Sequence, residues 1–187
     1  MTEINEISVV GLFGFIGSGK SYIINSLKEI KRFNPISKEE VGVLWYIEAY
    51  GVNNLEGYER ALYNEFKRDP LFLIRESLKS VKEGKINVID SVNTPIEDNY
   101  LRENYDYLLI GVWRRTQERM KSILSGRDKL VRTSEPRDEK SFLTLDELVK
   151  NYMYEGGCLF CSVDEMIINE GNNLMSKFVK AIDKKWK

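Results

Sequence analysis

The sequence contains no histidine, two cysteines and four prolines among its 187 residues. The absence of histidine removes the commonest general base and the commonest transition-metal ligand of proteins. The two cysteines, Cys158 and Cys161, are too few for a disulfide scaffold or for a four-ligand zinc site. We expect them to pack as small apolar residues near the last strand, with a redox pair as the alternative. Any chemistry must therefore depend on carboxylates, lysine, arginine, backbone amides and hard metal ions.

The sequence also lacks a run of about 18 apolar residues, which a membrane-spanning helix needs. Its first residues, MTEINEISVV, carry acids and do not resemble a secretory signal. These absences predict a cytoplasmic protein with no membrane partner. The formal net charge is −1, which disfavours a nucleic-acid partner because a basic binding surface is not evident from bulk charge.

Short apolar segments alternate with segments of helical periodicity, as in a parallel sheet whose strands are joined by helices. The predicted strands cover residues 7–13, 33–37, 85–90, 107–113 and 166–168. The predicted helices cover residues 22–33, 38–50, 55–68, 70–83, 96–104, 116–124, 144–154 and 174–186. Thr144 and Glu147 have the spacing of a capping box, which predicts a helix start at Thr144. We therefore predict one three-layer α/β domain over residues 1–187, with a parallel sheet of about five strands.

Residues 14–21, GFIGSGKS, match the phosphate-binding loop pattern G-x-x-x-x-G-K-S in full. Glycines let the backbone curl so that several N–H groups point at one anion, and the following helix adds the positive end of its dipole. Lys20 is expected to reach the β- and γ-phosphates of a nucleotide such as ATP, and Ser21 to offer its hydroxyl to Mg²⁺. Because the match follows a predicted strand and opens a predicted helix, a chance match is the weaker interpretation.

Asp90 ends the predicted strand over residues 85–90. Ligands of parallel α/β sheets bind at the carboxyl ends of the strands, so Asp90 would lie beside the phosphate loop if its strand is adjacent to the first. There it could hold Mg²⁺ through water or accept a proton from an attacking hydroxyl. The alternative is a solvated acid that caps the following loop. Spacing alone does not separate Asp90 from Glu97 or Asp98, but the strand end favours Asp90.

Six arginines are concentrated in one short part of the sequence: Arg114, Arg115, Arg119, Arg127, Arg132 and Arg137. Guanidinium groups match the oxygens of a phosphoryl group in transfer, and a loop that carries them can close over a nucleotide. Arg119, on a predicted helix, and Arg127, which opens the polar loop over 125–137, are the best catalytic candidates. For the others, a solvated basic surface paired with nearby acids is the plainer interpretation. A nucleic-acid patch is the weakest, because acids are interleaved.

Several segments occur in the order found in the small P-loop kinases of the adenylate kinase type: GFIGSGKS, NVIDSVNTP, YLLIGVWRRTQERM, SGRDKLVR and VDEMIINEGNN. The chain resembles this family over nearly its whole length, and most of all the dephospho-CoA-kinase-like and the archaeal or phage nucleotide kinases. The resemblance implies a three-layer P-loop NTPase fold with a helical acceptor-binding region over 38–84 and an arginine lid over 125–137. It also implies transfer of the γ-phosphoryl group of ATP, with Mg²⁺, to a small nucleotide-like acceptor.

The same resemblance implies roles for individual residues. Those expected to hold the donor nucleotide are Gly14, Gly17, Ser18, Gly19, Lys20, Ser21, Asn169 and Gly171, the last two at the adenine. Those expected to hold the metal ion are Ser21 and Asp90. Those expected to act in catalysis are Lys20, Asp90, Arg119 and Arg127.

The acceptor half departs from the pattern of that family. Such kinases usually place an acid and an arginine soon after the second strand, where this chain reads EEVGVLWYIEAY without arginine. The nearest arginines after that stretch are Arg60, Arg68 and Arg75. Asn93 stands where an arginine often follows the strand-end acid. Either the acceptor is unusual or acceptor phosphorylation has been lost. The alternative function is therefore an ATP- or GTP-binding regulatory NTPase with a macromolecular partner.

Overall fold

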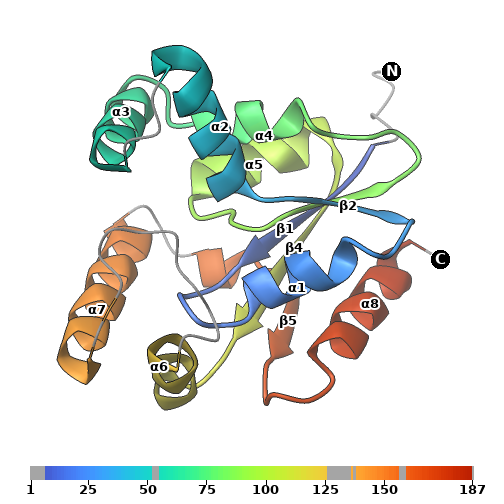
Figure 1. Cartoon of the computed structure of the whole chain (residues 1–187). Helices are drawn as coiled ribbons and strands as arrows, with labels where there is room; N and C mark the ends of the chain where they lie inside the picture. Colours follow the sequence, from blue (N-terminus) through green and yellow to red (C-terminus); the bar gives the residue numbers. More distant parts are fainter. Residues whose placement is uncertain (1–6, 52–54, 126–135, 137, 156–158, 187) are drawn as a thin grey trace.

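The computed structural model describes residues 7–51, 55–125, 136, 138–155 and 159–186. Its centre is a five-stranded sheet in the order β2-β3-β1-β4-β5, and every pair of neighbours is parallel. The strands are β1 (Ser8–Phe13), β2 (Phe33–Ile36), β3 (Ile86–Ile89), β4 (Asp106–Trp113) and β5 (Glu165–Ile168). The strand number and the parallel pairing confirm the predicted α/β sheet (Figure 1).

The strand order places β1 in the middle of the sheet, between β3 and β4. After β1 the chain crosses to β2 at one edge and returns to β3, and it then passes to the other side of β1 to form β4 and β5. In open α/β sheets, ligands bind at the carboxyl ends of the strands where the strand order reverses in this way. The carboxyl end of β1 is therefore the place at which a ligand is expected.

Helices cover both faces of the sheet and extend beyond its carboxyl edge. The helices are α1 (Lys20–Leu27), α2 (Lys38–Tyr50), α3 (Leu55–Arg68), α4 (Phe72–Leu78), α5 (Pro95–Asn104), α6 (Thr116–Leu124), α7 (Glu139–Glu155) and α8 (Leu174–Lys185), with a 3-10 turn η1 (Leu159–Cys161). In Figure 1 α2–α3 and α6–α7 lie on opposite sides of the phosphate loop between β1 and α1.

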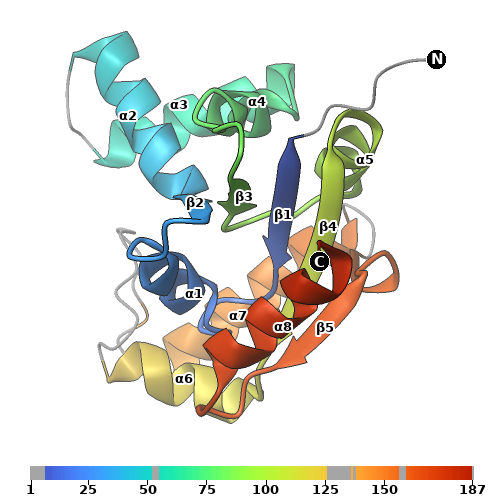
Figure 2. The ribbon, with the colours of Figure 1, turned by 90° about the vertical axis from the view of Figure 1, so that its right-hand side faces the viewer.

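The two faces of the sheet carry separate apolar clusters because side chains alternate along each strand. Val10 and Ile110 belong to the cluster that α1 and α8 cover. Val9 and Leu109 belong to the cluster on the opposite face, where α4, α5 and η1 contribute side chains. The result is the predicted three-layer arrangement, with α1 and α8 on the same side of the sheet (Figure 2).

Helices α1 and α7 begin earlier than the sequence predicts. Helix α1 begins at Lys20, inside the phosphate loop pattern, and ends at Leu27 so that the chain can turn into β2. Helix α7 begins at Glu139, and the carboxylate of Asp138 accepts the N–H of Ser141 at 2.8 Å. Thr144 lies inside this helix and its hydroxyl donates to the carbonyl of Lys140 at 3.0 Å, so the capping box predicted at Thr144 is wrong.

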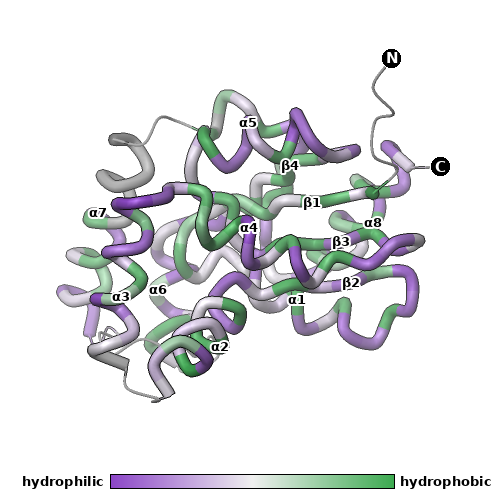
Figure 3. Tube along the Cα trace, turned by 90° about the horizontal axis from the view of Figure 1, so that it is seen from above, coloured by the Kyte–Doolittle hydropathy of each residue, from purple (hydrophilic) through white to green (hydrophobic). Residues whose placement is uncertain are grey.

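The hydropathy of the chain follows the same layers. In Figure 3 hydrophobic residues gather along β1 and β4, and hydrophilic residues are frequent on the outer helices. Across the described ranges, none of the helices combines the length and the apolar composition that crossing a bilayer requires.

Candidate nucleotide-binding site

The loop between β1 and α1 contains three positions whose backbone angles favour glycine. Gly14, Gly17 and Gly19 have φ angles of 153°, 74° and 112°. A Cβ atom on Gly14 would lie 2.4 Å from the carbonyl oxygen of Val112, and one on Gly19 would lie 2.6 Å from Nδ2 of Asn169. The glycines of the sequence pattern are therefore required both by the backbone angles and by close packing. This loop has the backbone geometry that a phosphate cradle needs.

Lys20 is the first residue of α1 and lies over the loop that precedes it. Its Nζ donates to the carbonyl oxygens of Gly14 at 2.5 Å and of Phe15 at 3.2 Å. The ammonium group is thus held against the concave backbone where phosphate oxygens are expected. Ser21, the next residue, is exposed at the start of the helix. Both side chains lie at the helix N-terminus, whose dipole favours an anion.

Ser18 is the one loop residue whose polar side chain is buried without a hydrogen bond. It is 1% exposed, and its hydroxyl has no partner in the described part of the chain. An unpartnered buried hydroxyl costs free energy, so its presence in the loop calls for a ligand or a water. Together with the curled glycine backbone and Lys20, it fits the phosphates of a nucleotide.

Asn169 joins the loop after β5 to the phosphate loop. Its Nδ2 donates to the carbonyl of Ser18 at 2.7 Å, and its Oδ1 accepts the N–H of Gly171 at 3.0 Å. Its own N–H donates to the carbonyl of Trp113 at 2.8 Å. The sequence predicts that Asn169 and Gly171 contact the adenine. The structure places Asn169 beside the phosphate loop, where it donates to Ser18. Gly171 is exposed, and contact of either residue with a base stays a prediction.

Asp90 follows β3, and β3 is the direct neighbour of β1, as its predicted role requires. Its carboxylate is half-buried and accepts the backbone N–H of Lys38 through Oδ1 at 3.0 Å. Lys38 is the first residue of α2, so Asp90 satisfies an N–H that has no partner within the helix. The carboxylate therefore lies at the positive end of the α2 dipole and one strand away from the phosphate loop.

No three metal-ligating side chains of the described ranges come together in one cluster. Such a result is compatible with Mg²⁺, which is usually bound through one or two protein oxygens, several waters and substrate phosphates. Ser21 and Asp90 are the protein groups that would hold Mg²⁺ beside a nucleotide in this site. Their chemistry, a hydroxyl and a carboxylate, fits a hard cation.

The structure corrects the predicted environment of Arg119. This residue is 1% exposed, and its guanidinium binds both carboxylate oxygens of Asp146, at 2.5 and 2.9 Å. The guanidinium also donates to the carbonyl of Ile16 at 3.1 Å, on the back of the phosphate loop. The ring of Phe15 lies 5.2 Å from the guanidinium carbon. Arg119 therefore supports the loop from behind and does not present an open guanidinium to a phosphate.

Two further residues contact this region, although the sequence analysis does not single them out as functional. Arg114 donates from Nη1 to the carbonyl of Gly17 at 3.4 Å, and Asp146 fixes Arg119. The clustering of arginines is the one signal that includes Arg114. Asp146 carries no such signal, because its partner lies 27 residues earlier in the sequence. Arg127, the predicted lid arginine, lies outside the described residues.

Two of the three arginines named for the acceptor side are paired with nearby acids. Arg68 pairs with Glu65, and Arg75 pairs with Asp69 at 2.8 Å. Aromatic rings pack against one another in the same helical region, including Trp45 of α2 against Phe72 of α4 with centroids 4.7 Å apart. Cys161 is exposed, so its predicted packing as a small apolar residue is wrong; Cys158 lies outside the described residues.

Neither a family model nor a curated protein matches the chain. Solved structures do resemble it. TT1252 from Thermus thermophilus has a TM-score of 0.61 at 14% identity, covering 98% of this chain and all of that one. A protein described as a candidate kinase from Chloroflexus aurantiacus has a TM-score of 0.61 at 13% identity, with coverage of 98% and 100%. Shikimate kinase from Bacteroides thetaiotaomicron has a TM-score of 0.54 at 9% identity, with coverage of 95% and 97%. At these identities the likeness concerns the fold, and this chain has the parallel 2-3-1-4-5 sheet typical of the small P-loop kinases.

Proposed function

We propose that this chain transfers the γ-phosphoryl group of ATP to a small nucleotide-like acceptor. The observation that carries the proposal is the geometry of the phosphate loop and its surroundings. Three glycines have positive φ, Lys20 donates to the carbonyls of Gly14 and Phe15, and a carboxylate stands at the end of the adjacent strand. A phosphate cradle alone supports nucleotide binding. The carboxylate beside it supports transfer, because it can act on the attacking group.

Each residue of the loop has a role in this proposal. Backbone N–H groups of the loop and the Ser18 hydroxyl bind phosphate oxygens, and Lys20 moves from the loop carbonyls to the β- and γ-phosphates. Ser21 and Asp90 hold the metal ion. Mg²⁺, when bound, neutralises charge that develops on the phosphoryl oxygens. In this proposal Asp90 either holds the metal ion through a water or, where the attacking group is a hydroxyl, accepts its proton.

The two arginines predicted as catalytic receive different roles. Arg119 acts through the phosphate loop, because its guanidinium is bonded to Ile16 and Asp146. Arg127 keeps its predicted role in a lid that contacts the transferring phosphoryl group. If it does so, Arg127→Ala slows turnover more than it weakens ATP binding. An equal effect on turnover and binding would point to simple ground-state binding.

Two candidate functions differ in what accepts the phosphoryl group. The resemblance to nucleotide kinases favours a nucleotide-like acceptor held by the region over 38–84. The pairing of Arg68 and Arg75 with their own acids favours the second candidate, a regulatory ATP- or GTP-binding NTPase with a macromolecular partner. In that case ATP would be hydrolysed slowly and no small molecule would accept the phosphoryl group.

The experiment that tests the proposal measures ATP consumption with Mg²⁺, first alone and then with a panel of acceptors. The panel contains nucleoside monophosphates, deoxynucleotides, dephospho-CoA, and hydroxylated compounds without phosphate. Stimulation by one acceptor, with recovery of its phosphorylated form, supports the kinase. Tight ATP binding without stimulation by any member supports the regulatory NTPase.

A further inference from the structure

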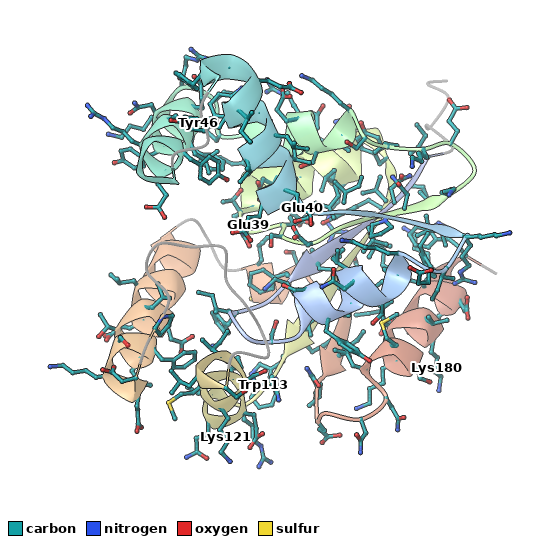
Figure 4. All side chains as sticks on the ribbon, in the orientation of Figure 1. Glu39, Glu40, Tyr46, Trp113, Lys121 and Lys180 are labelled. Carbon is teal, nitrogen blue, oxygen red and sulfur yellow. The ribbon has the colours of Figure 1, made fainter. Side chains whose placement is uncertain are left out.

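A buried ion pair joins the first residue of α2 to the first turn of α5. The Nζ of Lys38 lies 2.5 Å from Oε1 of Glu97, and the two side chains are 5% and 3% exposed. Lys38 and Glu97 lie on the two helices that follow β2 and β3, the strands on one side of β1. In Figure 4 the neighbouring residues Glu39 and Glu40 mark this end of α2, next to α1.

Lys38 contacts Asp90 directly, and Glu97 contacts the segment that follows Asp90. On one side, the backbone N–H of Lys38 donates to Oδ1 of Asp90 at 3.0 Å. On the other side, Oε2 of Glu97 accepts the N–H groups of Asn93 at 2.8 Å and Thr94 at 3.3 Å. Residues 91–94 connect Asp90 to α5, so Glu97 fixes the segment that directly follows the carboxylate. Lys38 and Glu97 thus close a ring of contacts around Asp90.

The N-terminal capping of α5 explains the contacts of Glu97 with residues 93 and 94, but it does not explain the ion pair with Lys38. The hydroxyl of Thr94 accepts the N–H of Glu97 at 3.3 Å, and together with the Glu97 carboxylate it forms a capping box. A glutamine at position 97 would serve such a box as well. A buried lysine partner is not needed for it, and burying two charges costs as much free energy as their attraction returns. What the ion pair adds is a fixed separation between the starts of α2 and α5.

We infer that Lys38 and Glu97 are positioning residues for Asp90, which hold its carboxylate toward the phosphate loop. The inference rests on the proposed function, because it takes Asp90 as the group that acts on the metal ion or the acceptor. Oδ1 is occupied by the N–H of Lys38, and no hydrogen bond reaches Oδ2 from the part of the chain that the structure describes. Oδ2 is therefore the oxygen available to a metal-bound water or an acceptor hydroxyl.

The decisive variant is Lys38→Met/Glu97→Gln, which replaces the ion pair by neutral side chains of similar size and keeps a capping residue. Because both charges are removed together, the variant is expected to fold with near wild-type stability. Lys38→Arg/Glu97→Asp restores an ion pair of similar total length and serves as the rescue. The matched control is Lys28→Met/Glu40→Gln, which neutralises an exposed pair, 3.7 Å apart, between the residue that follows α1 and the first turn of α2.

Two readouts report the position of Asp90. The first is the factor by which Mg²⁺ raises the affinity for ADP, obtained by calorimetry with and without the ion. We call this factor the Mg²⁺-dependent gain, or Mg²⁺ gain. The second is hydrogen exchange of the amide at position 38, which donates to Asp90. In Lys38→Met/Glu97→Gln we expect a loss of about tenfold or more in the Mg²⁺-dependent gain, typical of a lost supporting contact, with unchanged metal-free ADP affinity. We also expect faster exchange at position 38, and recovery of both in the rescue variant.

A folded Lys38→Met/Glu97→Gln protein with the wild-type Mg²⁺ gain and the wild-type amide exchange would overturn the inference. Asp90→Asn separates this failure from failure of the proposed function. If Asp90→Asn leaves the Mg²⁺ gain unchanged, the proposed metal role of Asp90 fails. The amide exchange at position 38 then still decides whether the ion pair positions Asp90.

Discussion

Arg119 and Asp146 form a bidentate ion pair, with distances of 2.5 and 2.9 Å, that is almost completely buried between α6 and α7. The same guanidinium donates to the carbonyl of Ile16 and to the carbonyl of Arg114. A single side chain therefore connects α7 to the back of the phosphate loop. The shape of the loop depends on a helix that lies more than 100 residues later in the sequence.

Asp146→Ala is expected to destabilise the protein by about 3–5 kcal/mol, because it leaves the Arg119 charge buried without its partner. Urea unfolding monitored by fluorescence measures this change. Glu147→Ala, an exposed neighbour on the same helix, is the control and is expected to change stability by less than about 0.5 kcal/mol. A loss below 1 kcal/mol in Asp146→Ala would mean that the pair is exchangeable for solvent contacts.

Gly14→Ala is expected to weaken ATP binding by more than about tenfold, a change of 1.4 kcal/mol. The added Cβ would meet the carbonyl oxygen of Val112 at 2.4 Å, so the loop must move. The control is Gly84→Ala, at a φ of 70° with no atom near the added Cβ. It is expected to cost about 1–2 kcal/mol of stability through backbone strain and to leave ATP binding unchanged. Equal ATP affinities in the two variants would contradict the close packing of the loop.

Ser18→Ala is expected to weaken ATP binding without lowering the free energy of unfolding. Because the Ser18 hydroxyl has no partner in the described structure, its removal should leave the free energy of unfolding unchanged or raise it by up to about 1 kcal/mol. If the hydroxyl binds a phosphate oxygen, ATP affinity falls by about 10- to 100-fold. The control is Ser77→Ala, which removes a buried hydroxyl bonded to Leu73 at 2.8 Å and should lose stability without affecting ATP. Unchanged ATP affinity in Ser18→Ala would remove Ser18 from the binding site.

Tyr107→Phe is expected to make the free energy of unfolding fall less steeply with pH above about pH 10. Burial raises the pKa of Tyr107 well above its usual value, and the negative charge of Asp98 adds to this effect. The unfolded chain therefore releases the Tyr107 proton near pH 10, before the folded protein does, so folding becomes less favourable as the pH rises above 10. Denaturant unfolding between pH 7 and 11 measures the slope. Tyr63→Phe, at an exposed site, should show the same dependence of stability on pH as the wild type. If Tyr107→Phe also lost stability with pH as steeply as the wild type, this account would be contradicted.

The sheet and the phosphate loop could be predicted from the sequence because both have local signals. The strand over 86–89 is a short apolar run, and the loop has glycines and a lysine at fixed spacing. The start of α7 was missed for a local reason: Asp138 with Ser141 and Thr144 with Glu147 are competing caps, and the earlier one is used. Such a competition is decided by the packing of the whole helix and not by the spacing of either pair.

The environment of Arg119 could not be predicted, because it depends on Asp146 and Ile16, which approach it only after α7 packs against α6. The position of Asp90 was predicted only on the condition that β3 is adjacent to β1, and the strand order now confirms that condition. The ion pair between Lys38 and Glu97 joins residues 59 positions apart. No local spacing pattern in the sequence predicts a contact over such a separation.

Transfer of labelled γ-phosphoryl from ATP tests the central claim most directly. The protein is incubated with labelled ATP, Mg²⁺ and a mixture of small cellular metabolites, and the label is followed by chromatography; Lys20→Ala, which removes the ammonium held over the loop, is the comparison. Our account predicts a labelled small molecule, other than inorganic phosphate, that the wild-type protein forms and Lys20→Ala does not. Label that remains in ATP or appears as inorganic phosphate alone, with intact ATP binding, would contradict it.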